Sequence, residues 1–196
     1  MNKDNGFSLI ELMVVISIVA VLASLAVPSF QGSIASSNLT STTNDLIATL
    51  ARARSDAIRR GNRVTVCMSA NGTQCTTTGE WSQGWIMFDD NVKSSLNASV
   101  DIDGSAPDDR ITQASPAASG NITIKSKSNT SYFSYTADGE IKLMNGGSGA
   151  GTISVCSSSS ALTNDTRARN IVINFVGRFK VVKPTGIAAT CPSPTT

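Results

Sequence analysis

The feature that most constrains this chain is a long apolar run near its start, from Phe7 to Val27. Between residues 12 and 27 the only polar side chains are those of Ser17 and Ser24. As an α-helix, this run of about 21 residues would be about 31 Å long, which is enough to cross the hydrocarbon core of a bilayer. We therefore expect the chain to begin with a membrane-spanning helix.

One acidic residue, Glu11, interrupts the apolar run. A carboxylate at the centre of a bilayer costs about 2.5–3.5 kcal/mol on insertion scales, so a simple anchor has no use for it. If the chain were cut between Gly6 and Phe7, a new α-amino group would lie four residues before Glu11. The amino group of a neighbouring subunit could then pair with this carboxylate, because a paired charge in a low dielectric costs far less than an isolated one. Glu11 would be an assembly residue that docks helices in register.

Two simpler interpretations compete with this one. Ser24 and Ala26 are small residues that suit the cleavage site of a secretory signal peptide. However, the charged region before the apolar run is short and contains Asp4, and Pro28 lies just beyond the possible site. A plain signal anchor would explain the apolar run but would leave its carboxylate unexplained. Both interpretations fit the sequence less well than cleavage before the run.

The segment GFSLIELMVVISIVAVLASLAVPSF, residues 6–30, resembles the N-terminal signature of type IV pilins and type II secretion pseudopilins. In that signature glycine precedes the cut, phenylalanine becomes the first residue and glutamate is the fifth. The resemblance implies cleavage between Gly6 and Phe7 by a membrane-embedded prepilin peptidase, N-methylation of Phe7, and later transfer of the helix from the inner membrane into a filament. Residues 1–6 would be the leader peptide and residues 7–28 the transmembrane and filament-core helix.

Beyond Pro28 the apolar residues continue on one side only, which is typical of an amphipathic helix over residues 29–61. We expect this helix to end near Arg60, because Gly61 is a natural residue to follow a helix end. Pro28 should disturb the helix, since its ring removes a donor and clashes with the carbonyl of Ser24. Arginines and Asp56 occupy most of the polar side. The expected buried side consists of Leu39, Leu46, Ile47, Leu50, Ala53, Ala57 and Ile58.

After Gly61 the chain changes to short β-branched and aromatic runs separated by Gly, Asp, Asn and Ser, which indicates strands. We expect a hairpin turn over residues 137–140. The fold class is therefore α+β: a long N-terminal helix packed against antiparallel sheet, with residues 62–196 forming one β-rich globular domain. Strands are expected over residues 63–69, 85–88, 121–126, 131–136, 140–144, 152–156, 170–175 and 178–182.

Several segments that could carry chemistry have simpler explanations. The chain has no histidine, so we expect no enzyme, no cofactor and no zinc site. The glycine-rich segment 145–151 lacks the Lys-Ser/Thr of a phosphate loop and reads as a turn. Asp101 and Asp103, with Asp108 and Asp109, could bind calcium, but a solvated loop is the better interpretation. The aromatic residues of segment 81–88 read as sheet core rather than as a ligand platform.

The four cysteines are typical of an exported protein with two disulfides, and three pairings are possible. We favour Cys67–Cys75, which closes a short loop, and Cys156–Cys191, which fastens the proline-containing C-terminal tail. A metal site is a poor alternative, because the cysteine spacing is wrong and histidine is absent.

Five further segments occur in an order that resembles the GspH/FimT-like minor pilins and pseudopilins. The resemblance implies a minor pilin of a type IV pilus that primes or caps the filament, with a type II secretion pseudopilin as an alternative. It also implies contact with other pilins through the N-terminal helix, and a globular domain that is periplasmic before assembly and at the cell surface afterwards. The segments are ARSDAIRRG (53–61), VTVC (64–67), WSQGWIMFDD (81–90), FSYTADG (133–139) and GRFK (177–180), the last followed by a terminal cysteine.

A basic stretch near the C-terminus suggests a second possible function, the binding of DNA. Some FimT-like proteins take part in DNA uptake through a Gly-Arg-x-Arg motif at a hairpin turn, and the matching residues here are 177–180. Lysine at position 180 keeps the charge but loses the planar fork that grips a phosphate. The alternative is a solvated cationic hairpin, or one that contacts acidic loops of a neighbouring pilin. The candidate residues for double-stranded DNA are Arg167, Arg169, Arg178, Lys180 and Lys183.

Overall fold

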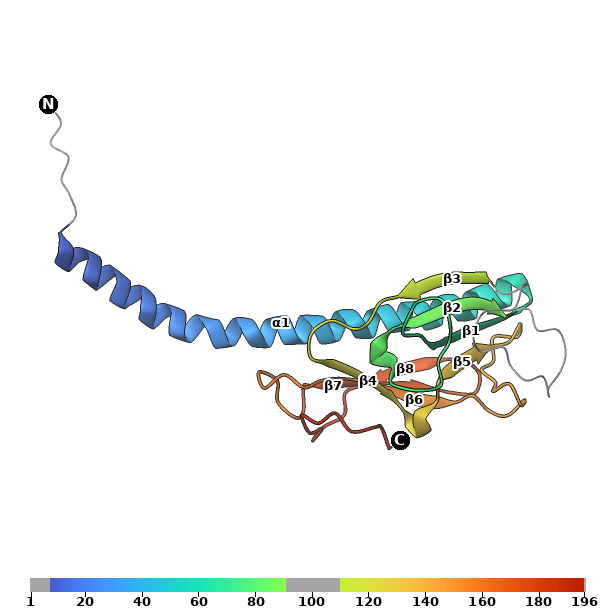
Figure 1. Cartoon of the computed structure of the whole chain (residues 1–196). Helices are drawn as coiled ribbons and strands as arrows, with labels where there is room; N and C mark the ends of the chain where they lie inside the picture. Colours follow the sequence, from blue (N-terminus) through green and yellow to red (C-terminus); the bar gives the residue numbers. More distant parts are fainter. Residues whose placement is uncertain (1–7, 91–109, 196) are drawn as a thin grey trace, which may run out of the picture.

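The structure is a computed structural model that describes residues 8–90 and 110–195. A single long helix, α1 (Leu9–Arg60), extends far beyond one end of a β-rich body, as Figure 1 shows. The other elements of the described residues follow along the chain as β1 (Arg63–Met68), η1 (Trp81–Gln83), β2 (Trp85–Asp90), β3 (Arg110–Ser115), β4 (Ile122–Ser126), η2 (Lys127–Asn129), β5 (Tyr132–Tyr135), β6 (Gly151–Ser157), β7 (Ala168–Ile173) and β8 (Phe179–Val182).

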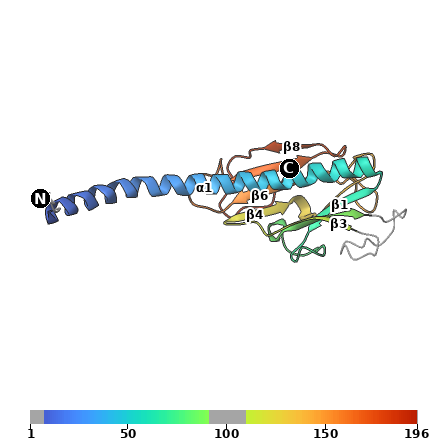
Figure 2. The ribbon, with the colours of Figure 1, turned by 90° about the horizontal axis from the view of Figure 1, so that it is seen from above.

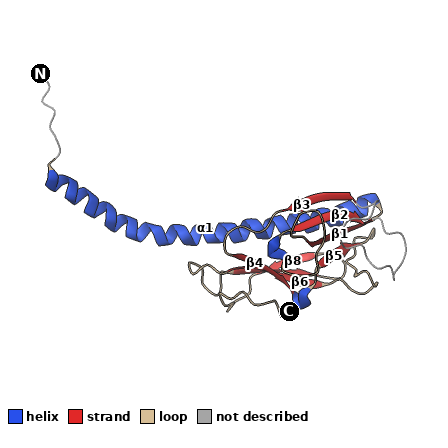
Figure 3. Cartoon of the chain, in the orientation of Figure 1, coloured by secondary structure: helices blue, strands red, loops and turns tan. Residues whose placement is uncertain are grey.

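The strands form two four-stranded antiparallel sheets rather than one. Their orders are β3-β2-β1-β5 and β4-β6-β7-β8, here called sheet A and sheet B. Figure 3 shows both sheets beside the second half of α1. The predicted α+β class is confirmed. The sequence did not indicate how the strands divide, because pairing between distant segments leaves no local signal.

The two ends of α1 have distinct caps. At the start, the Ser8 side chain accepts a hydrogen bond from the Glu11 backbone N–H. At the end, Gly61 adopts the left-handed conformation and donates to the carbonyl of Ala57 at 3.0 Å, so the predicted end at Arg60 is confirmed. α1 continues through Pro28 without a break and curves along its first half (Figure 1), so any disturbance at Pro28 is not an interruption of the helix.

Within the described part of the chain, no helical segment combines the length and apolar character needed to cross a membrane. The membrane-spanning helix over residues 7–28 therefore stays a prediction.

The second half of α1 provides one wall of the main core, and Figure 2 shows it running along the length of the β-rich body. Its contacts are chiefly with β1 of sheet A and with β6 of sheet B. The predicted buried side is confirmed except at its margins, where Ile47 is only partly buried and Ile58 is 51% exposed. Its fully buried members are Leu39, Leu46, Leu50, Ala53 and Ala57.

Most predicted strands agree with the structure to within a few residues, with two exceptions. β3 was not predicted. The strand predicted over residues 140–144 is wrong, because this segment makes only isolated bridges at Ile141 and Lys142 before it turns. The turn is closed by the Leu143 N–H, which donates to the carbonyl of Gly147 at 2.9 Å.

The outer face of each sheet carries a small apolar cluster that contains a disulfide. Cys67–Cys75 lies with Ile86 and Phe88 on sheet A, and Cys156–Cys191 lies with Ala168 on sheet B. These are the two pairings that the sequence analysis favoured. Trp81 and Trp85 are buried in the main core, so the aromatic residues of this segment have the structural role expected of them.

Candidate functional site

The first candidate site is the exposed apolar part of α1, residues 9–24, here called the helical arm. No part of the described body covers it, and its large apolar side chains are 49–77% exposed. Apolar residues surround the helix instead of forming one stripe, as in helices that lie in lipid or among other helices. A continuous exposed apolar surface of this kind marks a contact with lipid or with other proteins. The side chains are those of Leu9, Ile10, Leu12, Met13, Val14, Val15, Ile16, Ile18, Val19, Val21 and Leu22.

Glu11 lies in the first turn of the helical arm. Its side chain is exposed, and none of the described residues forms an ion pair with it. The proposed cleavage residues, Gly6 and Phe7, lie outside the described residues. The carboxylate is therefore accessible to a cation from another molecule, and the assembly role of Glu11 stays a prediction.

The second candidate site is the hairpin of β7 and β8. Its turn is closed by Asn174, whose backbone N–H donates to the carbonyl of Arg178 at 2.9 Å and whose Oδ1 accepts from the N–H of Arg178 at 2.9 Å. Gly177 supplies the positive φ of 73° that the turn requires. Arg178 and Lys180 are exposed, while Phe179 between them packs against the core, in agreement with the predicted alternation.

Arg54 of α1 holds the hairpin in place. Its Nε donates to the carbonyl of Gly139 at 3.0 Å, and its Nη2 donates to the carbonyl of Val176 at 3.1 Å. The two turns meet so closely that a Cβ on Gly177 would lie 2.2 Å from the carbonyl oxygen of Gly139. Sequence reasoning placed Arg54 on the solvent side of the helix and missed this role. The sequence signal that could have revealed this role of Arg54 is the pair of turn glycines, Gly139 and Gly177.

The five predicted DNA-binding residues do not form one surface. Arg167 is buried, and its guanidinium donates to the carbonyls of Ser157, Ser159 and Leu162, so it holds the β6–β7 connection. We therefore correct its assignment to a structural one. Arg169 is half-buried and its Nη1 donates to two nearby carbonyls. The accessible cations are Arg178, Lys180 and Lys183.

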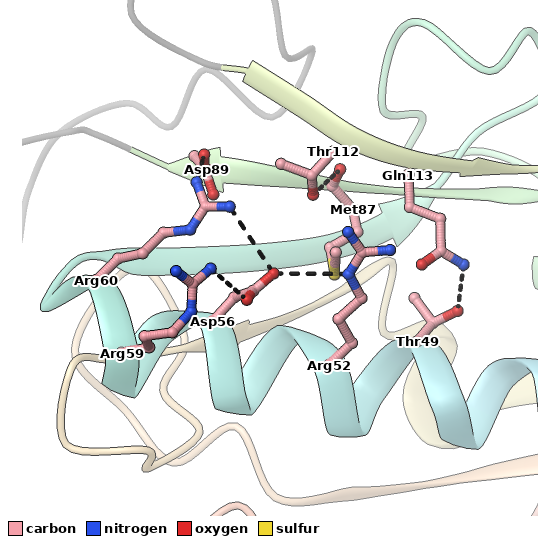
Figure 4. A network of polar contacts seen from close by, with 9 residues as sticks. All are labelled: Thr49, Arg52, Asp56, Arg59, Arg60, Met87, Asp89, Thr112 and Gln113. Atoms are coloured by element: carbon pink, nitrogen blue, oxygen red, sulfur yellow. Dashed lines mark hydrogen bonds and ion pairs between the residues drawn. The ribbon is translucent and has the colours of Figure 1, made fainter.

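The arginines at the end of α1 belong to a polar network with Asp56 at its centre (Figure 4). Asp56 accepts a hydrogen bond from Arg59 at 3.0 Å and pairs with Arg52 at 3.6 Å and with Arg60 at 4.0 Å. Arg60 also pairs with Asp89 of β2, which joins the last helical turn to sheet A. Much of the positive charge of this stretch is therefore balanced within the chain.

The candidate calcium segment, residues 101–109, lies outside the described residues. Among the residues that the structure describes, no group of three or more His, Cys, Asp or Glu side chains could hold a metal ion. The glycine-rich segment 145–151 forms a turn that leads into β6, as its composition predicted.

Comparison with known proteins relates this chain to pilins and to a family of type II transport proteins. Residues 42–177 match the family model for type II transport protein GspH, and residues 1–27 match the prokaryotic N-terminal methylation motif. The chain is 36% identical over 110 residues to fimbrial protein Q of Moraxella bovis, covering 54% of this chain and 63% of that protein. It is 46% identical over 48 residues to the type IV major alpha-pilin of the same organism, covering 24% and 30%. The chain thus spans less than two thirds of the length of these curated relatives.

The fold is shared with a solved structure. The type IV minor pilin FimU of Pseudomonas aeruginosa superposes with a TM-score of 0.51 at 18% identity, covering 81% of this chain and 93% of that one.

Proposed function

Because this chain belongs to the GspH family of type II transport proteins, and is thus a type IV pilin-like protein, we propose that it is a minor pilin that primes or caps a type IV pilus. The observation that carries the proposal is the helical arm, an exposed apolar helix with a single carboxylate, Glu11, in its first turn. The body leaves this arm free to pack with similar helices. Such packing is how a subunit would enter a filament core.

The proposed route begins with a precursor in the inner membrane, whose β-rich body lies in the periplasm. Prepilin peptidase cuts between Gly6 and Phe7, and the new terminus is N-methylated. The amino group of one subunit then pairs with Glu11 of a neighbour, which lowers the cost of burying both charges. This pairing aligns the helices as the subunits leave the membrane and form the pilus.

The variant Glu11→Ala tests this route. Membrane insertion should be unaffected, whereas the amount of the protein in sheared pili should fall by about tenfold or more, because the terminal amine loses its partner. Immunoblots of membranes and of sheared pili provide the measurement. Ser17→Ala is the matched control, since it removes a polar group from the same arm without changing its charge.

Normal incorporation of the Glu11→Ala protein would rule out the assembly role of that carboxylate. Mass spectrometry of the mature protein provides a separate check on processing. The expected first residue is N-methylated Phe7, and an intact leader or a start far downstream would contradict the pilin assignment.

A second candidate function is DNA binding for uptake in natural transformation. It is favoured by the exposed cations Arg178, Lys180 and Lys183, which could neutralise phosphates without reading sequence. The test is a salt titration of the full chain, in detergent, with double-stranded DNA. Affinity should fall steeply with salt and fall again in Arg178→Ala, but not in Lys127→Ala, which removes an exposed cation elsewhere. Absence of binding at low salt would eliminate this candidate.

A third candidate is a minor pseudopilin of a type II secretion system, which the description of the matched family supports. Deletion of the protein separates it from the first candidate. Loss of pili with normal secretion supports the pilus role, and loss of secretion with normal pili supports the pseudopilin role.

A further inference from the structure

The exposed apolar residues of the β-rich body are concentrated at one place. Beyond Ile34, the large apolar side chains that stand out as exposed among the described residues all lie on the β7–β8 hairpin or next to it, with exposures of 36–64%. Ile58 of α1 lies against the turn at Gly139, since its Cδ1 lies 2.7 Å from where a Cβ on Gly139 would be, and this turn meets the hairpin at Gly177. The side chains are those of Ile58, Val172, Phe175, Val181 and Val182.

β8 is also an open edge of sheet B. None of its four residues is buried, whereas three of the five residues of β4, at the opposite edge, are buried. Its register with β7 pairs Lys180 with Val172 and Val182 with Asn170. Hydrogen-bonded and non-hydrogen-bonded pairs alternate along an antiparallel ladder. Because Asn174 and Arg178 form a hydrogen-bonded pair at the turn, the pairs Val172–Lys180 and Asn170–Val182 are hydrogen-bonded as well.

The backbone groups of the alternate residues, Phe179 and Val181, therefore point away from β7. Among the described residues, neither makes a backbone hydrogen bond to a third segment. An exposed edge with apolar side chains invites another strand, and proteins normally cover or interrupt such an edge. Among the described residues, β8 contains no proline, and its protection against strand pairing is limited to its short length and to the charge of Lys180.

The charge around this edge indicates what could cover it. Arg178, Lys180 and Lys183 flank or lie within β8, and the sequence contains no acidic residue after Asp165. A second copy of β8 added antiparallel would bring like charges together, which destabilises a strand pair. Duplex DNA would neutralise the cations but would leave the valines and Phe175 exposed. An extended protein segment that combines apolar and acidic side chains satisfies both features.

We propose that β8 is a strand-addition site for a partner protein, which contributes an extended segment of alternating apolar and acidic residues. Backbone hydrogen bonds to Phe179 and Val181 supply affinity, and the side chains supply specificity. Apolar residues of the segment lie on the face of the sheet that carries Val181, and its carboxylates lie on the opposite face, where they pair with Lys180 and Arg178. This inference goes beyond the proposed place in a filament, because it holds for a partner of any origin that presents such a segment.

The test uses the full chain in detergent micelles and a short synthetic peptide in which valine alternates with glutamate. Peptide binding is measured by fluorescence anisotropy, and amide hydrogen exchange is resolved to single residues. Binding should protect the amides of Phe179 and Val181, while those of Lys180 and Val182 are already protected by β7. Two matched peptides serve as controls: one carries lysine in place of glutamate, and one has its β8-facing amides N-methylated. Neither should bind.

Two variants test the two sources of affinity. Val181→Pro removes an outward N–H at an edge position that tolerates proline, and should weaken binding by about tenfold or more. Val181→Thr keeps the N–H and a branched side chain, and should weaken it by about threefold or less. Lys180→Glu should exchange the preference, so that the lysine peptide binds in place of the glutamate peptide. If Val181→Pro fails to fold, the change of peptide preference in Lys180→Glu and the loss of binding by the N-methylated peptide still test the proposal.

Several outcomes would overturn the proposal. They are no binding of the glutamate peptide, equal binding of the N-methylated peptide, and no change in peptide preference for a folded Lys180→Glu protein. Binding of duplex DNA without binding of the glutamate peptide, with the DNA binding lost in Arg178→Ala, would also overturn the proposal and would assign the surface to nucleic acid.

Discussion

At the residue scale, the position of the β7–β8 hairpin depends on Arg54 and on two glycines. Arg54 satisfies two carbonyls from turns that are far apart in the sequence, and Gly177 and Gly139 allow those turns to touch. The hairpin carries the accessible cations and the open edge of β8. A structural defect at this junction would therefore move the whole candidate surface.

Gly177→Ala should lower the free energy of unfolding by about 3 kcal/mol or more, because it adds a steric clash to the cost of a positive φ. Gly186→Ala is a matched control: Gly186 has a similar φ of 71° but nothing within 4 Å of its Cβ position, so only the conformational cost of about 1 kcal/mol applies. Denaturant unfolding of both variants measures the difference. Equal losses would show that the close approach to Gly139 is unimportant.

Tyr135 is a second residue with a measurable effect. Its hydroxyl is buried and has no hydrogen-bond partner among the described residues, and burial raises the pKa of Tyr135, an effect that the nearby Arg54 partly opposes. The unfolded chain ionises this tyrosine near its ordinary pKa of 10.0 while the folded chain keeps it protonated. Its contribution to stability is therefore complete below about pH 10 and is lost as the pH rises further.

Tyr135→Phe should raise the free energy of unfolding at pH 7 by up to about 1 kcal/mol, because it removes an unsatisfied buried hydroxyl. The variant should also lose less stability than the wild type above about pH 10. Tyr132→Phe is the comparison, because the Tyr132 hydroxyl accepts a hydrogen bond from the N–H of Met144 and its removal should destabilise. Chemical denaturation at several pH values tests both expectations, and a destabilised Tyr135→Phe protein would contradict them.

At the scale of elements, the two disulfides fasten segments that the sheets alone hold weakly. The tail after β8 contains no helix or strand among the described residues, and its Gly186 and Ile187 N–H groups donate to Asp165 and Asn164 near the β6–β7 connection. Cys156–Cys191 closes a separation of 35 residues, and Cys67–Cys75 closes one of only 8.

Replacing both cysteines of each pair by serine should therefore have unequal effects. The chain-entropy relation assigns about 4 kcal/mol to Cys156–Cys191 and about 2.5 kcal/mol to Cys67–Cys75. Urea unfolding of the two double variants provides the comparison. A larger loss for the shorter loop would show that local packing of the apolar cluster on sheet A outweighs loop entropy.

At the scale of the whole molecule, α1 has two separable parts: the exposed helical arm and the second half, which packs against the β-rich body. Core contacts of α1 begin at Ala35, which is partly buried, and Leu39, which is fully buried. Residues 9–24, together with Phe30 and Ile34, contribute exposed apolar surface and are not part of the described core. The body should therefore not depend on the arm for its stability.

A chain that starts at Ala35 should be soluble without detergent and monomeric, and its Tm should lie within about 4 °C of that of the full chain in detergent. Size-exclusion chromatography and thermal unfolding provide the measurements. A chain that starts at Thr43 is the control, since it lacks the fully buried Leu39 and should be less stable. Aggregation of the chain that starts at Ala35 would show that the arm shields part of the body.

Sequence patterns by themselves determined those features of this protein that arise from neighbouring residues. The apolar arm, the helix end at Arg60, most strand positions and the alternation at Arg178 and Lys180 depend on local periodicity and on special residues such as Gly61. The favoured cysteine pairs also agree with the structure. Local sequence patterns thus predicted the fold class, and they predicted the cations of the β7–β8 hairpin but not the open edge of β8.

Only the tertiary structure decided the features that depend on contacts between distant segments. The division into two sheets, the addition of β3, the burial of Arg167 and the role of Arg54 follow from which carbonyls and strands meet in space. A buried arginine and an exposed one have the same local sequence signal, because a charge alone does not indicate its partners. For that reason the separation of the accessible cations from the buried Arg167, and the open edge of β8, became apparent only in the folded structure.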